Sequence, residues 1–99
     1  MKLFPLSPIR FHILLAVARD PAQASLIATR VAYDTFGELD LRPATLHDNL
    51  SYLSERGWLT EHAGKRFSLS QDGRQTLEND LYRWRIVTSR ATDTLRRTA

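Results

Sequence analysis

The side chains most suited to recognition chemistry lie in residues 42–59. Four of them donate and accept hydrogen bonds, namely Thr45, His47, Ser51 and Tyr52. On one face of a helix, such groups can contact the edges of base pairs in a major groove. Polar residues on any surface helix would look the same, and Asp48 and Glu55 share this face, where they would repel phosphates. The pattern therefore fits either a DNA-contacting helix or a solvated surface.

Three cations flank this segment. Arg42 stands at its start, and Lys65 and Arg66 follow at the tip of an expected hairpin. Cations at these places could reach phosphates or a minor groove. Arg42 could equally be a plain surface charge, and Lys65 and Arg66 could simply keep a hairpin turn soluble.

Other site chemistry is poorly represented in the sequence. His12, His47 and His62 lie far apart, with no Cys and no His-x-x-x-His pair, so we expect neither a metal site nor a cofactor. No Gly-x-Ser-x-Gly, glycine-rich phosphate loop or paired-carboxylate motif occurs. We therefore expect a binding protein rather than an enzyme.

The charge of the chain is unevenly distributed. The net charge of +3 invites a nucleic-acid interpretation. Residues 1–82, however, hold nine Lys/Arg and ten Asp/Glu, whereas residues 83–99 hold five arginines and only Asp93 as an acid. Charge alone therefore does not establish DNA binding, and the position of each cation in the fold has to decide.

The length and composition indicate one small domain in the cytoplasm. A chain of 99 residues forms a single modest core and would gain from oligomerisation. Residues 1–6 are expected to form an extended lead-in and lack the features of a signal peptide. No apolar run approaches the roughly 20 residues that span a bilayer. The absence of cysteine is ordinary for a cytosolic protein.

Proline and serine mark the start of the first helices. Ser7-Pro8 is a typical helix start, with a serine cap and a proline in the first turn, and predicts a helix over residues 8–18. Asp20-Pro21 repeats this signal and predicts a second helix over residues 21–35, which ends at Gly37. Residues 38–41 are expected to form a connector, with one small strand as an option.

A third helix and a hairpin follow. Pro43 suits a first helical position, Gly57 suits a left-handed helix end, and the intervening leucines fall on one stripe, at Leu46, Leu50 and Leu53. Residues 58–62 and 66–69 are predicted to form two strands around a turn that contains Gly64. Helix, tight stop and hairpin together predict a winged helix-turn-helix.

The last helix is long for so small a domain. Ser70 is expected to cap a helix over residues 71–95, which would extend about 37 Å. One apolar stripe runs along it and is the predicted dimer interface: Leu77, Leu81, Trp84, Val87 (or Thr88), Ala91 and Leu95. Such a stripe would stay wet in a monomer, so we expect a homodimer. Residues 1–73 would form the DNA-binding part and residues 74–99 the dimerisation helix of one structural unit.

Two local motifs and the order of elements resemble the PadR-like transcriptional regulators. Arg42–His47, the following leucines and Gly57-Trp58-Leu59 are similar to the family's Ser-Pro-x-Thr-Leu-Tyr, leucine spacing and Gly-Leu-Ile. Residues 69–74 are similar to its Leu-Thr-Pro-Glu-Gly-Arg. The sequence departs from the family at His47, which replaces a tyrosine, and at residues 20–25, where a His-Gly-Tyr segment is frequent. The step from glycine into the wing is shared with other winged helices such as the MarR-like group.

The resemblance implies a mainly α fold with a small β-hairpin wing and a single C-terminal dimerisation helix, as in the shorter members of the family. It further implies a homodimer that binds double-stranded DNA and regulates transcription; we expect a repressor, with activation as the alternative. A winged-helix module that binds a protein instead of DNA is the alternative. Trp84 is expected to pack in the dimer interface; with Tyr82 it could instead line a pocket for a small aromatic effector, because flat molecules stack on such rings.

Overall fold

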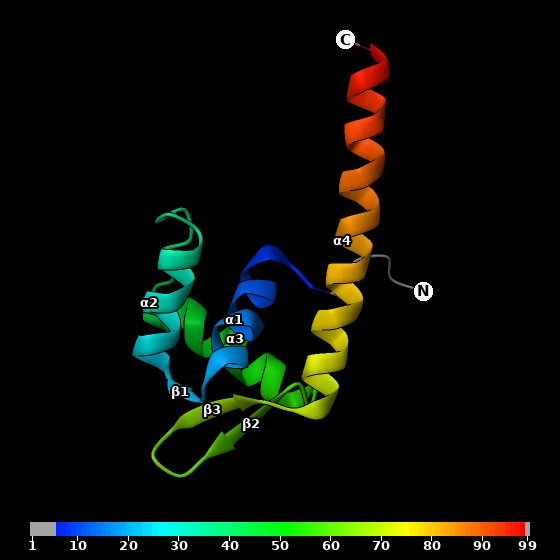
Figure 1. Cartoon of the computed structure of the whole chain (residues 1–99). Helices are drawn as coiled ribbons and strands as arrows, with labels where there is room; N and C mark the ends of the chain where they lie inside the picture. Colours follow the sequence, from blue (N-terminus) through cyan, green and yellow to red (C-terminus); the bar gives the residue numbers. More distant parts are fainter. Residues whose placement is uncertain (1–5, 99) are drawn as a thin grey trace.

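The computed structural model describes residues 6–98, which form four helices and three short strands (Figure 1). In chain order these are α1 (Pro8–Arg19), β1 (Ala22–Gln23), α2 (Ala24–Asp34), α3 (Pro43–Glu55), β2 (Leu59–His62), β3 (Arg66–Leu69) and α4 (Gln71–Thr98). The predicted fold class is confirmed: the chain is mainly helical, with a small antiparallel sheet and a long C-terminal helix. Residues 1–5 of the expected lead-in lie outside the described residues.

The first helix begins where its serine and proline predict. The Ser7 hydroxyl accepts a hydrogen bond from the backbone N–H of Arg10 at 3.3 Å, and Pro8 occupies the first turn. This satisfies one of the free N–H groups at the helix start. The helix ends at Arg19, one residue later than predicted.

The predicted start of the second helix is wrong. Residues Ala22 and Gln23 form strand β1 rather than a first helical turn, and α2 begins at Ala24. In β1, Ala22 pairs with Phe67 and Gln23 with Arg66, so the sheet has the order β1-β3-β2. Backbone pairing with β3 and burial of the Ala22 side chain outweigh the start signal of the preceding proline. The wing is therefore braced by a third strand.

Helix α2 ends at Asp34, and Gly37 closes the turn that follows it. Gly37 has a left-handed backbone with φ of 81°, and its N–H donates to the carbonyl of Ala32 at 2.8 Å. The optional strand over residues 38–41 is not formed. Instead the N–H of Leu39 donates to the Thr35 hydroxyl, which fixes the start of the connector.

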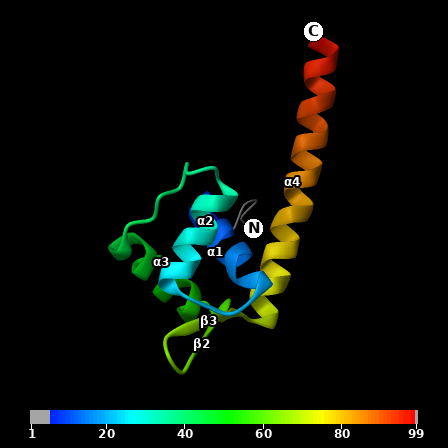
Figure 2. The same cartoon turned by 60° about the vertical axis from the view of Figure 1, so that its left-hand side comes forward.

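The core lies where α1, α2 and α3 meet. Its fully buried side chains include Ile13, Leu14, Ile27, Val31 and Leu53. The predicted stripe of α3 leucines faces this core, as expected. Burying each such side chain stabilises the fold by about 1.5–3 kcal/mol, which fixes α3 against the other two helices. Figure 2 shows α2 and α3 together on the side of the molecule away from α4.

A tight joint connects α3, the sheet and α4. Gly57 has φ of 77° and lets the N–H of Trp58 bond to the carbonyl of Leu53. The Ser70 hydroxyl donates to the Gly57 carbonyl at 2.5 Å and accepts the N–H of Gly73 at 2.9 Å, which confirms Ser70 as the cap of the last helix. The wing and both flanking helices are thereby held in one rigid arrangement.

The last helix extends far beyond the rest of the molecule. Its 28 residues span about 42 Å, and it ends three residues later than predicted. Its first part packs on α1 and buries Gly73, Leu77 and Asp80. Residues 84–98 are all exposed, and both views show this half projecting alone (Figures 1 and 2). Among the described residues, no helix is both long and apolar enough to span a membrane.

Candidate nucleic-acid interface

Helix α3 presents a polar face to solvent. Of the predicted contacts on this helix, Thr45, His47 and Ser51 are exposed. Asp48 and Glu55 are exposed on the same helix, so the face carries negative charge as well as neutral hydrogen-bonding groups. Its side chains are available to a partner because the leucines on the opposite side hold the helix against the core.

Tyr52 is packed differently from the other predicted contacts. Its ring is half-buried, with the guanidinium carbon of Arg10 lying 3.6 Å from the ring centroid. The Trp58 ring meets it edge-on at 6.4 Å, and Arg56 lies 5.4 Å from its centroid. Tyr52 thus lies in a cation–aromatic stack on the α1 side of α3, and only part of it can meet a partner.

Arg10 is a residue that sequence reasoning missed at this site. Its Nε donates to the Asn49 side-chain oxygen at 3.1 Å, and the Asn49 amide donates to the carbonyl of Thr45 at 2.8 Å. Arg10 is therefore anchored to α3 through both Asn49 and Tyr52. It stands on another helix, 39 residues before Asn49, and no local pattern could have identified the contact.

A groove runs between the start of α2, the first turns of α3 and the wing. Its volume is about 620 Å³, and it brings together His47 of α3 and Lys65 of the wing. Glu61 lines it too and adds an acid beside these groups. The remaining walls are mainly small or apolar: Gln23, Ala24, Ser25, Ala28, Leu41, Pro43, Leu46, Leu50, Gly64 and Phe67. Two predicted contacts from distant parts of the sequence thus border one concave surface.

The wing tip is a constrained turn. Gly64 and Lys65 both have left-handed backbones, with φ of 77° and 56°, so Lys65 adopts a conformation uncommon for a residue with a side chain. The Gln23 side chain donates to the Gly64 carbonyl at 3.1 Å and ties the tip to the start of α2. Lys65 is exposed, and the hydrogen bond at the neighbouring Gly64 helps to hold the turn that presents it.

The two other predicted cations, Arg66 and Arg42, differ in the hydrogen bonds that their side chains make. Arg66 is exposed, and its guanidinium donates to the Pro21 carbonyl at 3.4 Å, so it also braces the wing. Arg42 is exposed at the N-cap of α3, where its side chain makes no cap hydrogen bond. Both therefore lie at the edges of the α3 and wing surface.

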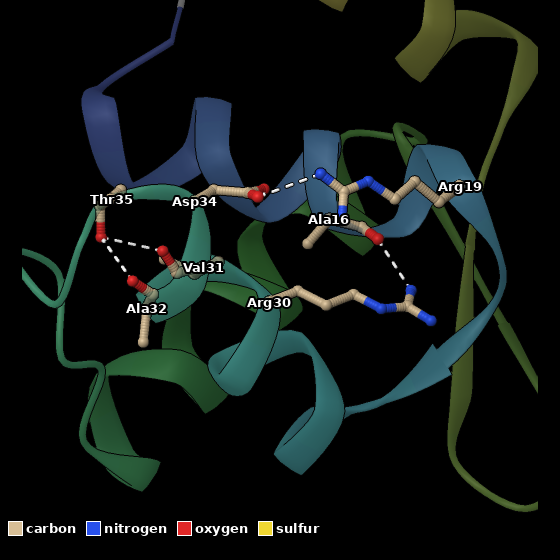
Figure 3. A network of polar contacts seen from close by, with 7 residues as sticks. All are labelled: Ala16, Arg19, Arg30, Val31, Ala32, Asp34 and Thr35. Atoms are coloured by element: carbon tan, nitrogen blue, oxygen red, sulfur yellow. Dashed lines mark hydrogen bonds and ion pairs between the residues drawn. The ribbon is translucent and has the colours of Figure 1, made fainter.

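A polar network fixes α2 relative to α1 (Figure 3). Arg30 donates to the carbonyls of Ala16 at 2.8 Å and Asp20 at 2.9 Å, and Arg19 pairs with Asp34 at 3.0 Å. Arg30 of α2 thus braces the C-terminal end of α1. The network holds the middle and the end of α2 against α1, and the first residues of the same helix line the groove.

The predicted dimer stripe on α4 falls into two parts. Leu77 is buried in the core of its own chain. Leu81, Trp84 and Val87 are 40%, 43% and 40% exposed, and Leu95 is 69% exposed. An apolar surface therefore begins at Leu81, and Leu77 has no comparable exposed area. A cavity of about 360 Å³ lies beside Trp84, lined by Leu6, Pro8, Phe11, His12, Leu81 and Trp84.

Asp80 is a buried carboxyl that the sequence analysis did not identify. It is fully inaccessible where α4 packs on the body. Burial raises the pKa of this carboxyl above its usual value, while a hydrogen bond from the Trp84 side chain and the charge of Arg83 act in the opposite direction. The helical period of α4 places residue 80 beside Leu77 on the inner face, and this spacing could have predicted that Asp80 is buried.

Comparison with known proteins supports the fold. No known protein-family profile matches the sequence. No curated protein matches it either. Among solved structures, the chain is similar to a transcriptional regulator from Clostridium thermocellum, with a TM-score of 0.75 and 12% sequence identity over 86% of this chain and 90% of that one. At this identity the likeness shows a shared fold.

Proposed function

We propose that the chain is a sequence-specific DNA-binding regulator of transcription, PadR-like in type, which acts as a homodimer and represses its target. It would act by binding and not by catalysis. The observation that carries the proposal is the groove that His47 of α3 and Lys65 of the wing border together. A helix in the major groove with a wing beside it needs this proximity.

The exposed side chains support separate roles. Thr45, His47 and Ser51 would contact base edges, with Tyr52 contributing through its exposed part. Arg42, Lys65 and Arg66 would contact phosphates or the minor groove. The rigid joint at Gly57 and Ser70 supports this division, because it keeps helix and wing at a fixed spacing.

The homodimer rests on the projecting half of α4. Its apolar side chains stay partly exposed in the single chain: Trp84 is 43%, Val87 40% and Leu95 69% exposed. Burying them against a second copy is favourable by about 25 cal/mol per Å² of apolar surface. A two-fold dimer would bind a pseudo-palindromic site with half-sites about one helical turn apart.

The test is binding of a labelled duplex from the region upstream of the chain's own coding sequence. Fluorescence anisotropy at several salt concentrations should give tighter binding to this duplex than to a scrambled duplex of equal composition. Equal affinity for both duplexes, or no binding at low salt, would favour the protein-interaction module instead. The acidic Asp48, Glu55 and Glu61 would then belong to a protein-binding face.

A small aromatic effector is a second part of the proposal. The supporting observation is the cavity beside Trp84, which includes Phe11 and His12 in its walls. Its volume of about 360 Å³ lies at the lower end of the range for small-molecule sites. Titration of planar phenolic compounds against Trp84 fluorescence, in a Trp58→Phe background, tests it; an unchanged signal would leave the cavity to another occupant.

A further inference from the structure

The end of α2 and the turn after it present two aromatic side chains to solvent. Tyr33 is 80% exposed and Phe36 is 97% exposed, the two largest values among the large hydrophobic residues that the structure describes. A hollow of about 560 Å³ is lined by Ala32, Tyr33, Asp34, Phe36 and Gly37. Both aromatic residues therefore lie outside the core and border one concave surface.

Phe36 has a strained backbone as well as an exposed ring. Its φ of 53° is left-handed, which is an outlier for a bulky residue but is readily adopted by glycine or asparagine. Neither this strain nor the exposure of the ring stabilises the chain. Strained residues cluster at functional sites, where the surrounding structure holds them in place. Packing within its own chain therefore does not account for a phenylalanine at this position.

Hydrogen bonds hold the backbone of this turn. The N–H of Phe36 donates to the carbonyl of Tyr33 at 3.3 Å. The Thr35 hydroxyl donates to the carbonyl of Val31 at 2.8 Å (Figure 3) and accepts the N–H of Leu39 at 3.1 Å. The backbone that carries both rings is thus fixed before any partner binds, so less conformational entropy is lost on binding.

The charge around the two rings is negative. Residues 31–41 contain no Lys or Arg but three acids, namely Asp34, Glu38 and Asp40. Asp34 pairs with Arg19, whereas Glu38 and Asp40 are exposed and form no ion pair with any residue in the described range 6–98. Arg42 is the next cation along the chain and lies at the start of α3. The surface beside the rings therefore favours a partner with positive charge.

We propose that residues 33–40, here called the docking turn, bind a basic segment of another protein in which arginine or lysine side chains flank an apolar one. The faces of the Tyr33 and Phe36 rings attract guanidinium and ammonium groups. The carboxylates of Glu38 and Asp40 accept hydrogen bonds from the same cations. The apolar side chain of the segment enters the hollow, and the two aromatic residues act as the anchors of the interface.

The docking turn lies at the end of α2 that is remote from the wing (Figure 1). Helix α2 starts directly after β1, which pairs with the wing, and its 11 residues extend about 16 Å. Glu38 and Asp40 would repel phosphates, so nucleic acid does not suit this surface. The inference therefore goes beyond the proposed function, and a chain that bound no DNA could still dock the basic segment.

Binding of two labelled synthetic peptides to the full chain tests the proposal. One contains arginine and alanine around a central leucine, and the other has glutamate in place of arginine. Fluorescence anisotropy should show binding of the basic peptide alone; equal binding of both would overturn the proposal. Tyr33→Ala should weaken binding by about tenfold or more, as expected for an interface anchor. Tyr82→Ala is the matched control, a tyrosine 65% exposed on α4, and should bind as the wild type does.

Phe36→Asn separates docking from folding. Asparagine adopts the left-handed backbone readily, and the ring that it replaces is almost fully exposed. The midpoint of urea unfolding should therefore equal or exceed that of the wild type, while affinity for the basic peptide falls as it does in Tyr33→Ala. A lower midpoint would show that the ring stabilises its own chain, and an unchanged affinity would show that it does not contact the peptide. Either result overturns the proposal.

The acidic side chains supply the last test. Glu38→Gln combined with Asp40→Asn should weaken binding of the basic peptide and reduce its dependence on salt. A larger loss from Asp48→Asn combined with Glu55→Gln would show that the peptide binds the acidic face of α3 instead. A lower mass of Phe36→Asn than of the wild type by light scattering would make a second copy of the chain the occupant of the docking turn. Both outcomes contradict the proposal.

Discussion

The guanidinium carbon of Arg10 on α1 lies over the ring of Tyr52 on α3, 3.6 Å from its centroid. The same guanidinium bonds to Asn49, one turn earlier on α3. A single side chain thus holds the helix proposed to enter the major groove at two successive turns. The orientation of this helix relative to the body therefore depends on Arg10 as well as on the leucine stripe.

Replacing Arg10 by alanine should destabilise the chain by about 1–2 kcal/mol, because a cation–π contact and a hydrogen bond are lost. Arg10→Lys should recover part of the lost stability, since it keeps the positive charge. A lysine ammonium, however, lacks the planar guanidinium that contacts the Tyr52 ring and donates to Asn49 at the same time. Urea unfolding followed by fluorescence measures both. Arg90→Ala, in the projecting half of α4, is the matched control. A midpoint for Arg10→Ala equal to that of Arg90→Ala would show that the stack contributes nothing.

Lys65→Ala and Arg66→Ala should weaken binding to all duplexes alike. Each lost phosphate contact should reduce the slope of log affinity against log salt by about 1. Fluorescence anisotropy over a series of salt concentrations gives this slope. Arg74→Ala, an exposed cation on α4, serves as the control. If the wing variants keep the wild-type slope, the wing does not contact DNA.

His47→Ala and Ser51→Ala should instead change which sequence is preferred. Loss of a base contact should weaken the free energy of binding to the preferred duplex by about 1–3 kcal/mol and should change binding to a random duplex little. The ratio of the two affinities is therefore the relevant measurement. Both side chains are exposed, so the folded state should tolerate either change. A uniform loss on both duplexes would contradict a role in base recognition and would indicate a phosphate contact.

Local signals in the sequence were sufficient for most elements. The starts of α1 and α3 depend on proline in the first turn, and the end of α3 depends on a glycine that can take a left-handed backbone. These effects act within a few residues, so the bounds of both helices could be predicted closely. Strand β1 could not be predicted, because it has only two residues and no periodicity, and its pairing partners Arg66 and Phe67 lie 43 and 45 residues downstream.

The candidate site was predictable only in part. The polar face of α3 and the cations of the wing follow from the period of the helix and the position of the turn. The groove between them depends on how the sheet packs beside α3, and the Arg10–Tyr52 stack depends on α1 crossing α3. Such tertiary contacts leave no mark in the spacing of residues along the chain.

Leu95→Glu should convert the proposed dimer into single chains. The side chain is 69% exposed, so its replacement should leave the fold of the single chain intact. In a dimer, the two glutamates would place two negative charges in the dimer interface. Leu81→Glu with Trp84→Glu should act in the same way. Ile86→Glu is the matched control, because Ile86 is exposed on the other side of the helix, and it should stay dimeric. Light scattering at micromolar concentration distinguishes the masses; equal dimerisation of Leu95→Glu and Ile86→Glu would exclude this face.

Asp80 should make stability depend on pH in a direction opposite to that of an ion-paired carboxyl. Burial raises its pKa in the folded chain above the unfolded value of 3.8, so the folded state favours the protonated form. The folded state therefore loses stability as pH rises from the unfolded pKa through the folded pKa, and regains it as pH falls.

Asp80→Asn stays neutral at every pH and keeps a similar shape. The urea midpoint of this variant should exceed that of the wild type at pH 7, and the difference should shrink toward pH 4. A difference that grows as the pH falls would mean that Arg83 and Trp84 outweigh burial and that the carboxylate is stabilised in the folded chain.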